Sequence, residues 1–290
     1  MNKRKRKQRR QYCKIVFPIM MLCMLLALCR LGSSDRKEPT EIKGVTVIAQ
    51  PLEQLFESAD KETGDDGEAE LSVDRMLDYI RNHPEQYTEA LTELAEKNAE
   101  AVEFVYYYPV EGAIDVTIDL SEEAFSDTVP LLLQWDSRWG YCKYGSGMIG
   151  YTGCGPTCLS MVSLFLTNDN RYTPKYIAEC AEREGYYVQG SGTSWELMSV
   201  GCRMFGLKAT ELTLDESVIT AALDKGRPVI CAMGRGDFTD SGHFIVITGY
   251  DSEGFCINDP NSRERSKKRW KFSQIKWQIR NLWAFQARQE

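Results

Sequence analysis

Residues 153–157 read Gly-Cys-Gly-Pro-Thr, and the nine residues that follow, 158–166, are mostly apolar. A run that is apolar on nearly every side is typical of a helix buried in a core. Because the first turn of a helix accepts a proline, Pro156 places the start of this helix close to Cys154. Backbone N–H groups and the helix dipole at that end favour a thiolate, which is the nucleophilic form of cysteine. The segment therefore predicts a buried helix that begins with a nucleophilic thiol.

Only two histidines, His83 and His243, could serve as a base for this thiol. His83 precedes a proline in an acidic helical stretch, which favours a surface turn. His243 opens the sequence Phe-Ile-Val-Ile-Thr, residues 244–248, a strand that is apolar on both faces and therefore interior. A hydrogen-bonded structural histidine is the alternative interpretation at this position. His243 is the candidate base.

A base needs a partner that orients it, and the next predicted strand ends with Asn258 and Asp259. If a five-residue loop, 250–254, joins the two strands, Asp259 lies opposite Ile245 and within side-chain reach of His243. A four-residue loop turns Asp259 away, and Asn258 is then the partner. The register of the hairpin therefore decides between the two residues.

Gln134 is the candidate donor for an oxyanion, with the backbone amide of Cys154 as the second donor. A packing amide in an aromatic cluster is the alternative role for Gln134. The residues predicted to line the site are Gly153, Gly155, Gly242 and Asn258. Residues 129–290 contain no Cys-x-x-Cys pair and only one histidine, so neither a metal site nor a cofactor is predicted.

Four short motifs occur in order along the chain: Gln-x-Asp-x-x-Trp at 134–139, Gly-Cys-Gly-Pro-Thr at 153–157, Gly-His-Phe at 242–244 and Asn-Asp-Pro at 258–260. Together they resemble the papain-like cysteine peptidases of family thirty-nine, in the bacterial branch similar to double-glycine leader peptidases. The resemblance covers about residues 129–286. It implies a papain-like α+β fold, in which a buried helix carrying the cysteine packs on an antiparallel sheet carrying the histidine and the aspartate.

By this resemblance, Cys154 is the nucleophile, His243 the general base, Asp259 its orienting acid and Gln134 the oxyanion residue. Since twenty residues separate Gln134 from Cys154, a loop at 143–152 has to be accommodated between them. The expected function is a thiol peptidase that cleaves peptide or protein substrates through an acyl-enzyme. An amidase or acyl transferase acting on cell-wall peptides, an idle peptide-binding module and a disulfide-linked surface protein are the alternatives.

The amino-terminal region combines a basic stretch, residues 3–14, with an uncharged apolar stretch, residues 15–29. This order is typical of a signal anchor or a signal peptide. As an anchor, residues 15–31 would insert in the membrane with the amino terminus in the cytoplasm and the rest outside. Cleavage near residues 32–34 is the rival interpretation, and it predicts a secreted protein.

Charge is distributed unevenly along the chain. Residues 1–40 hold eleven of the 35 Lys/Arg and two of the 42 Asp/Glu, which leaves residues 41–290 with a net charge of -16. An acidic body of this kind is a poor match for nucleic acid. We divide the chain into a leader, 1–34, a linker, 35–71, a small helical segment with its connector, 72–128, and a peptidase domain, 129–290.

The apolar periodicity predicts helices first and an antiparallel sheet after them, which indicates an α+β domain. The predicted helices cover residues 73–82, 85–98, 99–107, 154–166, 174–184, 194–205 and 214–225. The predicted strands cover residues 228–233, 244–249, 255–259 and 282–286. Seven cysteines lie between residues 129 and 290, and this odd number leaves at least one unpaired, in keeping with a free Cys154.

Overall fold

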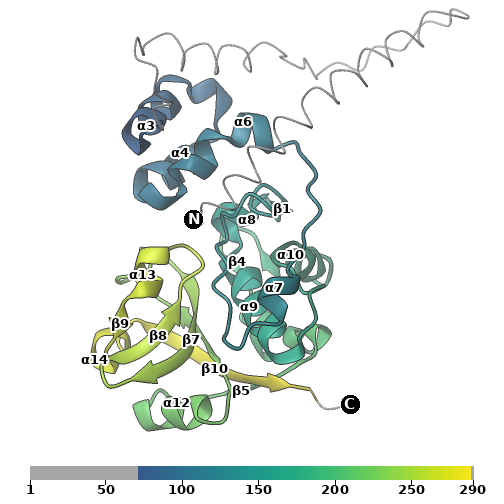
Figure 1. The fold of residues 1–290 in the computed structure, drawn as a ribbon, viewed down its shortest axis with the longest axis vertical. Helices are drawn as coiled ribbons and strands as arrows, with labels where there is room; N and C mark the ends of the chain where they lie inside the picture. The colour runs from purple at the N-terminus through teal and green to yellow at the C-terminus, as the bar shows by residue number, and fades with distance from the viewer. Residues whose placement is uncertain (1–70, 289–290) are drawn as a thin grey trace, which may run out of the picture. The chain divides into compact units, whose positions relative to one another are not determined.

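Figure 1 presents the fold in a computed structural model, which describes residues 71–288. These residues all belong to one compact unit. The predicted leader and almost all of the predicted linker lie outside the described residues. Within residues 71–288, no helix is both long enough and apolar enough to cross a membrane.

Twelve α-helices lie within the described residues, most of them short. They are α3 (Val73–Asn82), α4 (Glu89–Lys97), α5 (Val102–Tyr106), α6 (Tyr108–Glu111), α7 (Ser121–Ala124), α8 (Ile149–Thr152), α9 (Cys154–Thr167), α10 (Pro174–Arg183), α11 (Glu196–Ser199), α12 (Glu216–Leu223), α13 (Arg263–Lys267) and α14 (Phe272–Ile275). Three 3₁₀ helices add Pro84–Gln86, Ala99–Ala101 and Gly201–Phe205.

Six strands form one antiparallel sheet in the order β5-β10-β6-β7-β8-β9, and four short strands form two small hairpins. The sheet contains β5 (Leu207–Glu211), β6 (Val229–Met233), β7 (His243–Asp251), β8 (Gly254–Asn258), β9 (Arg269–Trp270) and β10 (Ile279–Ala287). The hairpins pair β1 (Lys143–Tyr144) with β2 (Gly147–Met148), and β3 (Tyr187–Val188) with β4 (Gly192–Thr193). Helices with one antiparallel sheet confirm the predicted α+β class.

The central strands of the sheet are covered on both faces. Val246 packs into the core around α9, whereas Ile245, its neighbour in β7, packs into a second core with α12 (Figure 1). Successive side chains of a strand point to opposite faces, so a strand between two cores must be apolar throughout. All five residues of β6 and the first five of β7 are buried. The interior strand predicted from residues 244–248 is confirmed.

The helix α9 is the buried helix that the sequence predicts. All residues from 155 to 164 are buried, because α9 packs against β7 and β10 on one side and against α10 on another. The helix ends at Thr167, and Asn168 adopts the left-handed conformation that commonly terminates helices. Burial of most of the helix fixes the position of its first residue, Cys154.

The helical segment, residues 73–111, shares a core with the domain that follows it. Ser72 caps α3 by accepting a hydrogen bond from the Arg75 N–H, and the helix ends before His83, as the following proline predicts. The buried side chains of α3 to α5 pack against residues from the beginning of the peptidase region. This shared core includes Ile80, Leu91, Val102, Val105, Leu133, Trp135 and Met148.

The predicted and the observed elements differ in several places. The helix predicted at 85–98 begins only at Glu89, because Thr88 caps it and residues 84–86 form a 3₁₀ turn. The helix predicted at 194–205 divides into α11 and a 3₁₀ helix, which meet at Val200 and Gly201. The strands β5 and β9 were not predicted, since β5 has one buried residue and β9 has only two residues.

Candidate active site

Cys154 is the first residue of α9, and its side chain is partly exposed. Because Cys154 begins the helix, its backbone N–H has no partner within the helix. The glycines on either side allow close packing there. A Cβ on Gly153 would lie 2.6 Å from the Ile149 carbonyl oxygen, and one on Gly155 would lie 2.6 Å from the Thr193 hydroxyl. Gly153 and Gly155 thus let neighbouring residues pack closely against the turn that carries the thiol. At Gly242, by contrast, an added Cβ would meet no atom within 4 Å.

His243 is the first residue of β7, and it is buried together with Asp259. Its Nε2 lies 2.8 Å from Oδ1 of Asp259. A carboxylate can only accept, so Nε2 carries the proton and donates, which leaves Nδ1 as the ring nitrogen for Cys154. Burial alone would lower the pKa of His243, but the Asp259 carboxylate and, after it, the interaction with Cys154 raise it to about 10. The site therefore favours an imidazolium next to the sulfur.

A β-bulge at Thr248 sets the register that brings these residues together. The loop of the hairpin is a two-residue turn between Asp251 and Gly254, so the predicted five-residue loop is wrong. The register shifts by one residue between Ile247 and Gly249, and Val246 then pairs with Asn258. This is the pairing that the longer loop would have produced. Without the bulge, Asp259 would be one position out of register and turned away from His243.

Asp259 has further partners on α13 and in the turn that follows β8. Its Oδ2 accepts a hydrogen bond from Nε of Arg265, and its Oδ1 accepts one from the Asn261 N–H at 2.8 Å. Burial would raise the pKa of Asp259, but His243 and Arg265 outweigh that effect and lower it below the usual 3.8. Asp259 therefore stays ionised although it is fully buried.

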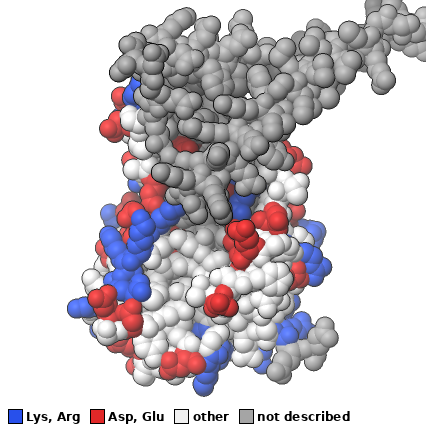
Figure 2. All heavy atoms as spheres, in the orientation of Figure 1, with Lys and Arg blue, Asp and Glu red and all other residues white. Residues whose placement is uncertain are grey.

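The sequence did not identify Arg265 as part of this site. Five of residues 263–269 are basic, a pattern usually found on a solvated face, and Figure 2 shows Lys and Arg side chains gathered over α13 and β9. Three of these five basic side chains pair with carboxylates: Arg265 with Asp259, Lys267 with Glu264 and Arg269 with Asp251. Arg265 differs from the other basic residues only because the position of α13 brings it to the buried Asp259.

Gln134 is buried beside the turn that precedes Cys154. Its Nε2 donates to the Gly150 carbonyl at 3.0 Å, and its backbone N–H donates to the Pro260 carbonyl at 2.7 Å. The segment between Gln134 and Cys154 contains the β1–β2 hairpin and α8, which return the chain to the glutamine. The second proton of Nε2 is the one that could face an oxyanion.

The structure separates Asn258 from the imidazole. Its amide donates to the carbonyls of Val129 and Pro130 at 3.0 and 3.1 Å, so it fastens the start of the domain to β8. Asn258 as an alternative partner of His243 is therefore wrong, because its side chain is committed elsewhere. The other histidine, His83, instead stacks its ring on Tyr79, with the ring centroids 3.9 Å apart.

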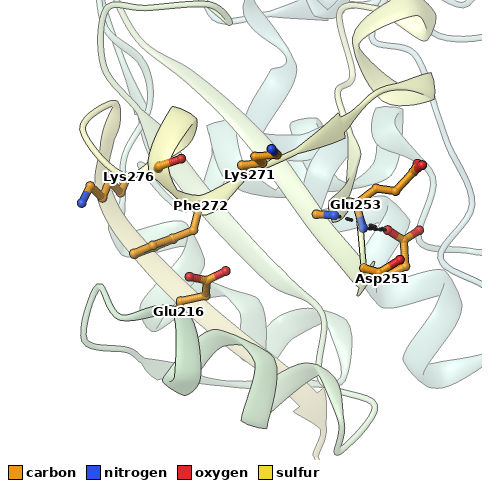
Figure 3. A pocket seen from close by; sticks show the side chains of 9 residues that line it. Glu216, Asp251, Glu253, Lys271, Phe272 and Lys276 are labelled. Atoms are coloured by element: carbon orange, nitrogen blue, oxygen red, sulfur yellow. Dashed lines mark hydrogen bonds between the residues drawn. The ribbon is translucent and has the colours of Figure 1, made fainter.

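A separate pocket of about 430 Å³ lies near the β7–β8 turn (Figure 3). It contains both signs of charge, and the Glu253 and Gly254 N–H groups of the turn donate to the Asp251 carboxylate. Its lining residues are Glu216, Asp251, Ser252, Glu253, Gly254, Lys271, Phe272, Ser273 and Lys276. None of the candidate catalytic residues is among them, so this pocket is distinct from the site around Cys154.

Comparison with known proteins gives a family for residues 126–289, which match the model of the Peptidase_C39 like family. Among solved structures, the chain is similar to the peptidase domain of ComA, a bifunctional ABC transporter of Streptococcus involved in a quorum-sensing pathway. The identity is 19%, the TM-score 0.39, and the match covers 56% of this chain and 99% of that one.

A second similar structure comes from Bacillus anthracis and was assigned as a C39-like peptidase. The identity is 17%, the TM-score is 0.33, and the match covers 61% of this chain and 100% of that one. No curated protein matches the chain. The family model covers more than half of the sequence and includes all four motifs that carry the resemblance. The chain therefore belongs to the Peptidase_C39 like family.

Proposed function

We propose that this protein is a cysteine peptidase that hydrolyses peptide bonds with Cys154, His243 and Asp259. The observation that carries the proposal is the buried His243–Asp259 pair, joined at 2.8 Å, with the second ring nitrogen left for Cys154 at the start of α9. An imidazole that is oriented by an acid and interacts with a thiol is the arrangement that activates a nucleophile.

The reaction begins when Sγ of Cys154 attacks the substrate carbonyl carbon, and the carbonyl electron pair moves to oxygen. The Cys154 N–H and the free proton of Gln134 Nε2 are the proposed donors to that oxygen. His243 then gives its Nδ1 proton to the amine as the C–N bond breaks, which leaves a thioester. Water attacks the thioester, its proton passes to Nδ1, and the S–C bond breaks to regenerate the thiolate.

The test compares three cysteines of the same chain. Cys142 and Cys256 are, like Cys154, free and partly exposed, but burial raises the pKa of both of their thiols. At neutral pH and substoichiometric iodoacetamide, we expect the label at Cys154 because only the thiolate reacts. Peptide mapping by mass spectrometry measures the distribution. Equal labelling of the three residues would contradict the proposal.

Cleavage is tested with a peptide library digested from a bacterial proteome, in which new termini are identified by mass spectrometry. The wild-type chain is expected to generate termini that a Cys154→Ala variant does not. Selective labelling of Cys154 without any new termini would instead favour an idle binding module. New acylated amines in place of free carboxylates would favour an acyl transferase.

We propose that the catalytic domain works outside the cytoplasm, tethered by residues 15–31 or released after cleavage near residues 32–34. The support is the basic stretch followed by an uncharged apolar stretch in the sequence. In intact cells that express the full chain, a membrane-impermeant amine reagent is expected to modify lysines of residues 71–288. Fractionation then separates an anchored protein from a secreted one. Protection of these lysines in intact cells but not in lysed cells would overturn the proposal.

A further inference from the structure

The turn that carries Asp259 is held by the helical segment, residues 73–111, from 163 residues earlier in the chain. The Asn98 amide, just after α4, donates to the backbone and side-chain oxygens of Asn261 at 2.8 and 3.1 Å. The Asn261 N–H in turn donates to Oδ1 of Asp259 at 2.8 Å. Asn261 therefore links the helical segment to the carboxylate that orients His243.

Glu100 makes the denser contact with the same region. Its carboxylate accepts hydrogen bonds from the Ser262 hydroxyl at 2.5 Å, from the Arg263 N–H at 2.9 Å and from the Glu264 N–H at 3.3 Å. Ser262 is the N-cap of α13, and the two amides belong to its first turn. Hydrogen bonds to an ionised acceptor are stronger than neutral ones, so one side chain of the helical segment fixes where α13 begins.

The helix α13 carries the side chains that hold Asp259 in place. Arg265 donates to Oδ2 of Asp259, and the Ser266 hydroxyl accepts from the Asp259 N–H at 2.9 Å. Because α13 has only five residues, a displacement of its first turn moves both side chains. The contacts of Glu100 are therefore transmitted to Asp259 through one short rigid element.

We propose that Glu100 is a positioning residue for Asp259, and that the helical segment is for this reason a part of the working peptidase rather than a stalk. The inference rests on the proposed function of Cys154, His243 and Asp259. It predicts that a change in the helical segment, which contains none of the catalytic residues, alters the reactivity of Cys154.

The experiment uses the full chain with Glu100→Gln, and with Glu103→Gln as the matched control. Glutamine keeps the size of Glu100 but removes the charge. Glu103 lies three residues further along, is exposed, and takes the same change. The rate constant for alkylation of Cys154 by iodoacetamide is expected to fall about tenfold or more in Glu100→Gln, since small displacements at a catalytic group cost up to ~100-fold. It is expected to stay at the wild-type value in Glu103→Gln.

A double-mutant cycle with Arg265→Gln distinguishes positioning from general stabilisation. If Glu100 acts through Arg265, the double variant is no slower than Arg265→Gln alone, whereas independent effects would multiply. Arg265 lowers the pKa of Asp259, whose other charged neighbour is His243. Both single variants are therefore expected to move the acid limb of the pH–rate profile to higher pH. A role limited to stability would leave that limb unchanged.

Thermal unfolding shows whether each variant is folded at the assay temperature. If the Glu100→Gln variant is unfolded at that temperature, the Asn98→Ser variant replaces it. A serine side chain can still accept from the Glu100 N–H, but it lacks the amide that donates to Asn261. Cys154 of the wild type reacting no faster than Cys142 would overturn the proposed function itself. A reactive wild type with equal rates in Glu100→Gln and Glu103→Gln would overturn this inference alone.

Discussion

Replacing His243 with glutamine is expected to lower the rate at which the protein cleaves any peptide substrate by about 10²–10⁴-fold, the usual contribution of a general acid–base. Glutamine can still donate to Asp259, so the buried carboxylate keeps a partner. It cannot take or give a proton at the sulfur or at the leaving amine. Iodoacetamide labelling of Cys154 is expected to fall to the level of Cys142 and Cys256.

The pH profile adds a second readout to the His243→Gln variant. The pKa of His243 is raised from 6.5 to about 10, so its imidazolium persists through neutral pH and is lost as the pH rises through about 10. The alkaline limb of the wild-type profile is expected there and is expected to be missing in the variant. The stability that the charged pair contributes is fully present below pH 6.5 and disappears over the same rise.

The matched control is His83→Gln, at the only other histidine of the chain. Its ring stacks on Tyr79, and its Nδ1 lies 2.8 Å from the Tyr79 carbonyl oxygen. This change is expected to leave cleavage and labelling at the wild-type values. A His243→Gln variant that cleaves as fast as His83→Gln would show that the imidazole of His243 takes no part in the reaction.

The elements with strong local signals could be predicted from the sequence. The apolar run after Cys154 indicated a buried helix, and α9 is buried along most of its length. Both ends of α3 followed from a capping serine, Ser72, and from the proline after His83. Where packing and local preference agree in this way, a single sequence is sufficient to place an element.

The hairpin of β7 and β8 shows how a correct result can follow from a wrong intermediate step. The predicted loop was three residues too long, yet the bulge at Thr248 restored the register that brings Asp259 to His243. The position of a bulge depends on the whole sheet, and no residue pattern in the strand predicted this one. The predicted proximity of His243 and Asp259 is confirmed by their hydrogen bond, but not the loop on which it was based.

The surroundings of Asp259 could not be predicted, because they depend on long-range contacts. Glu100 and Ser262 are separated by 162 residues, and neither belongs to a recognisable motif. Arg265 lies only six residues from Asp259, but its role requires that α13 fold back on the end of β8. Local patterns carry no information about such a return of the chain.

Replacing Asp259 with alanine is expected to have the largest combined effect on activity and stability. Peptide cleavage is expected to fall by about 10⁴-fold, as when the orienting acid of a comparable triad is changed. The free energy of unfolding is expected to fall by about 3–5 kcal/mol, because removing one partner of a buried ion pair leaves its other charges unpaired. The charges left unpaired are those of Arg265 and His243, whose side chains are 25% and 7% exposed.

The pH dependence of stability identifies the ion pair as the cause. The pKa of Asp259 is held below its ordinary 3.8, so its contribution is present above that value and is lost as the pH falls through the lowered pKa. Denaturant titrations of the wild type and the variant are expected to differ most between pH 3.8 and 6.5, above the ordinary pKa of Asp259 and below that of His243. Their free energies of unfolding are expected to converge at strongly acidic pH.

Asp259→Asn, alone and with Arg265→Met, separates loss of charge from loss of shape. The asparagine Oδ1 can still accept from His243, but its Nδ2 would face the Arg265 guanidinium, and two donors cannot bond to each other. Removing the arginine relieves that conflict, so the double variant is expected to be more stable than Asp259→Asn alone. If Arg265→Met instead destabilises the Asp259→Asn variant further, the arginine contributes to stability through contacts other than the carboxylate of Asp259.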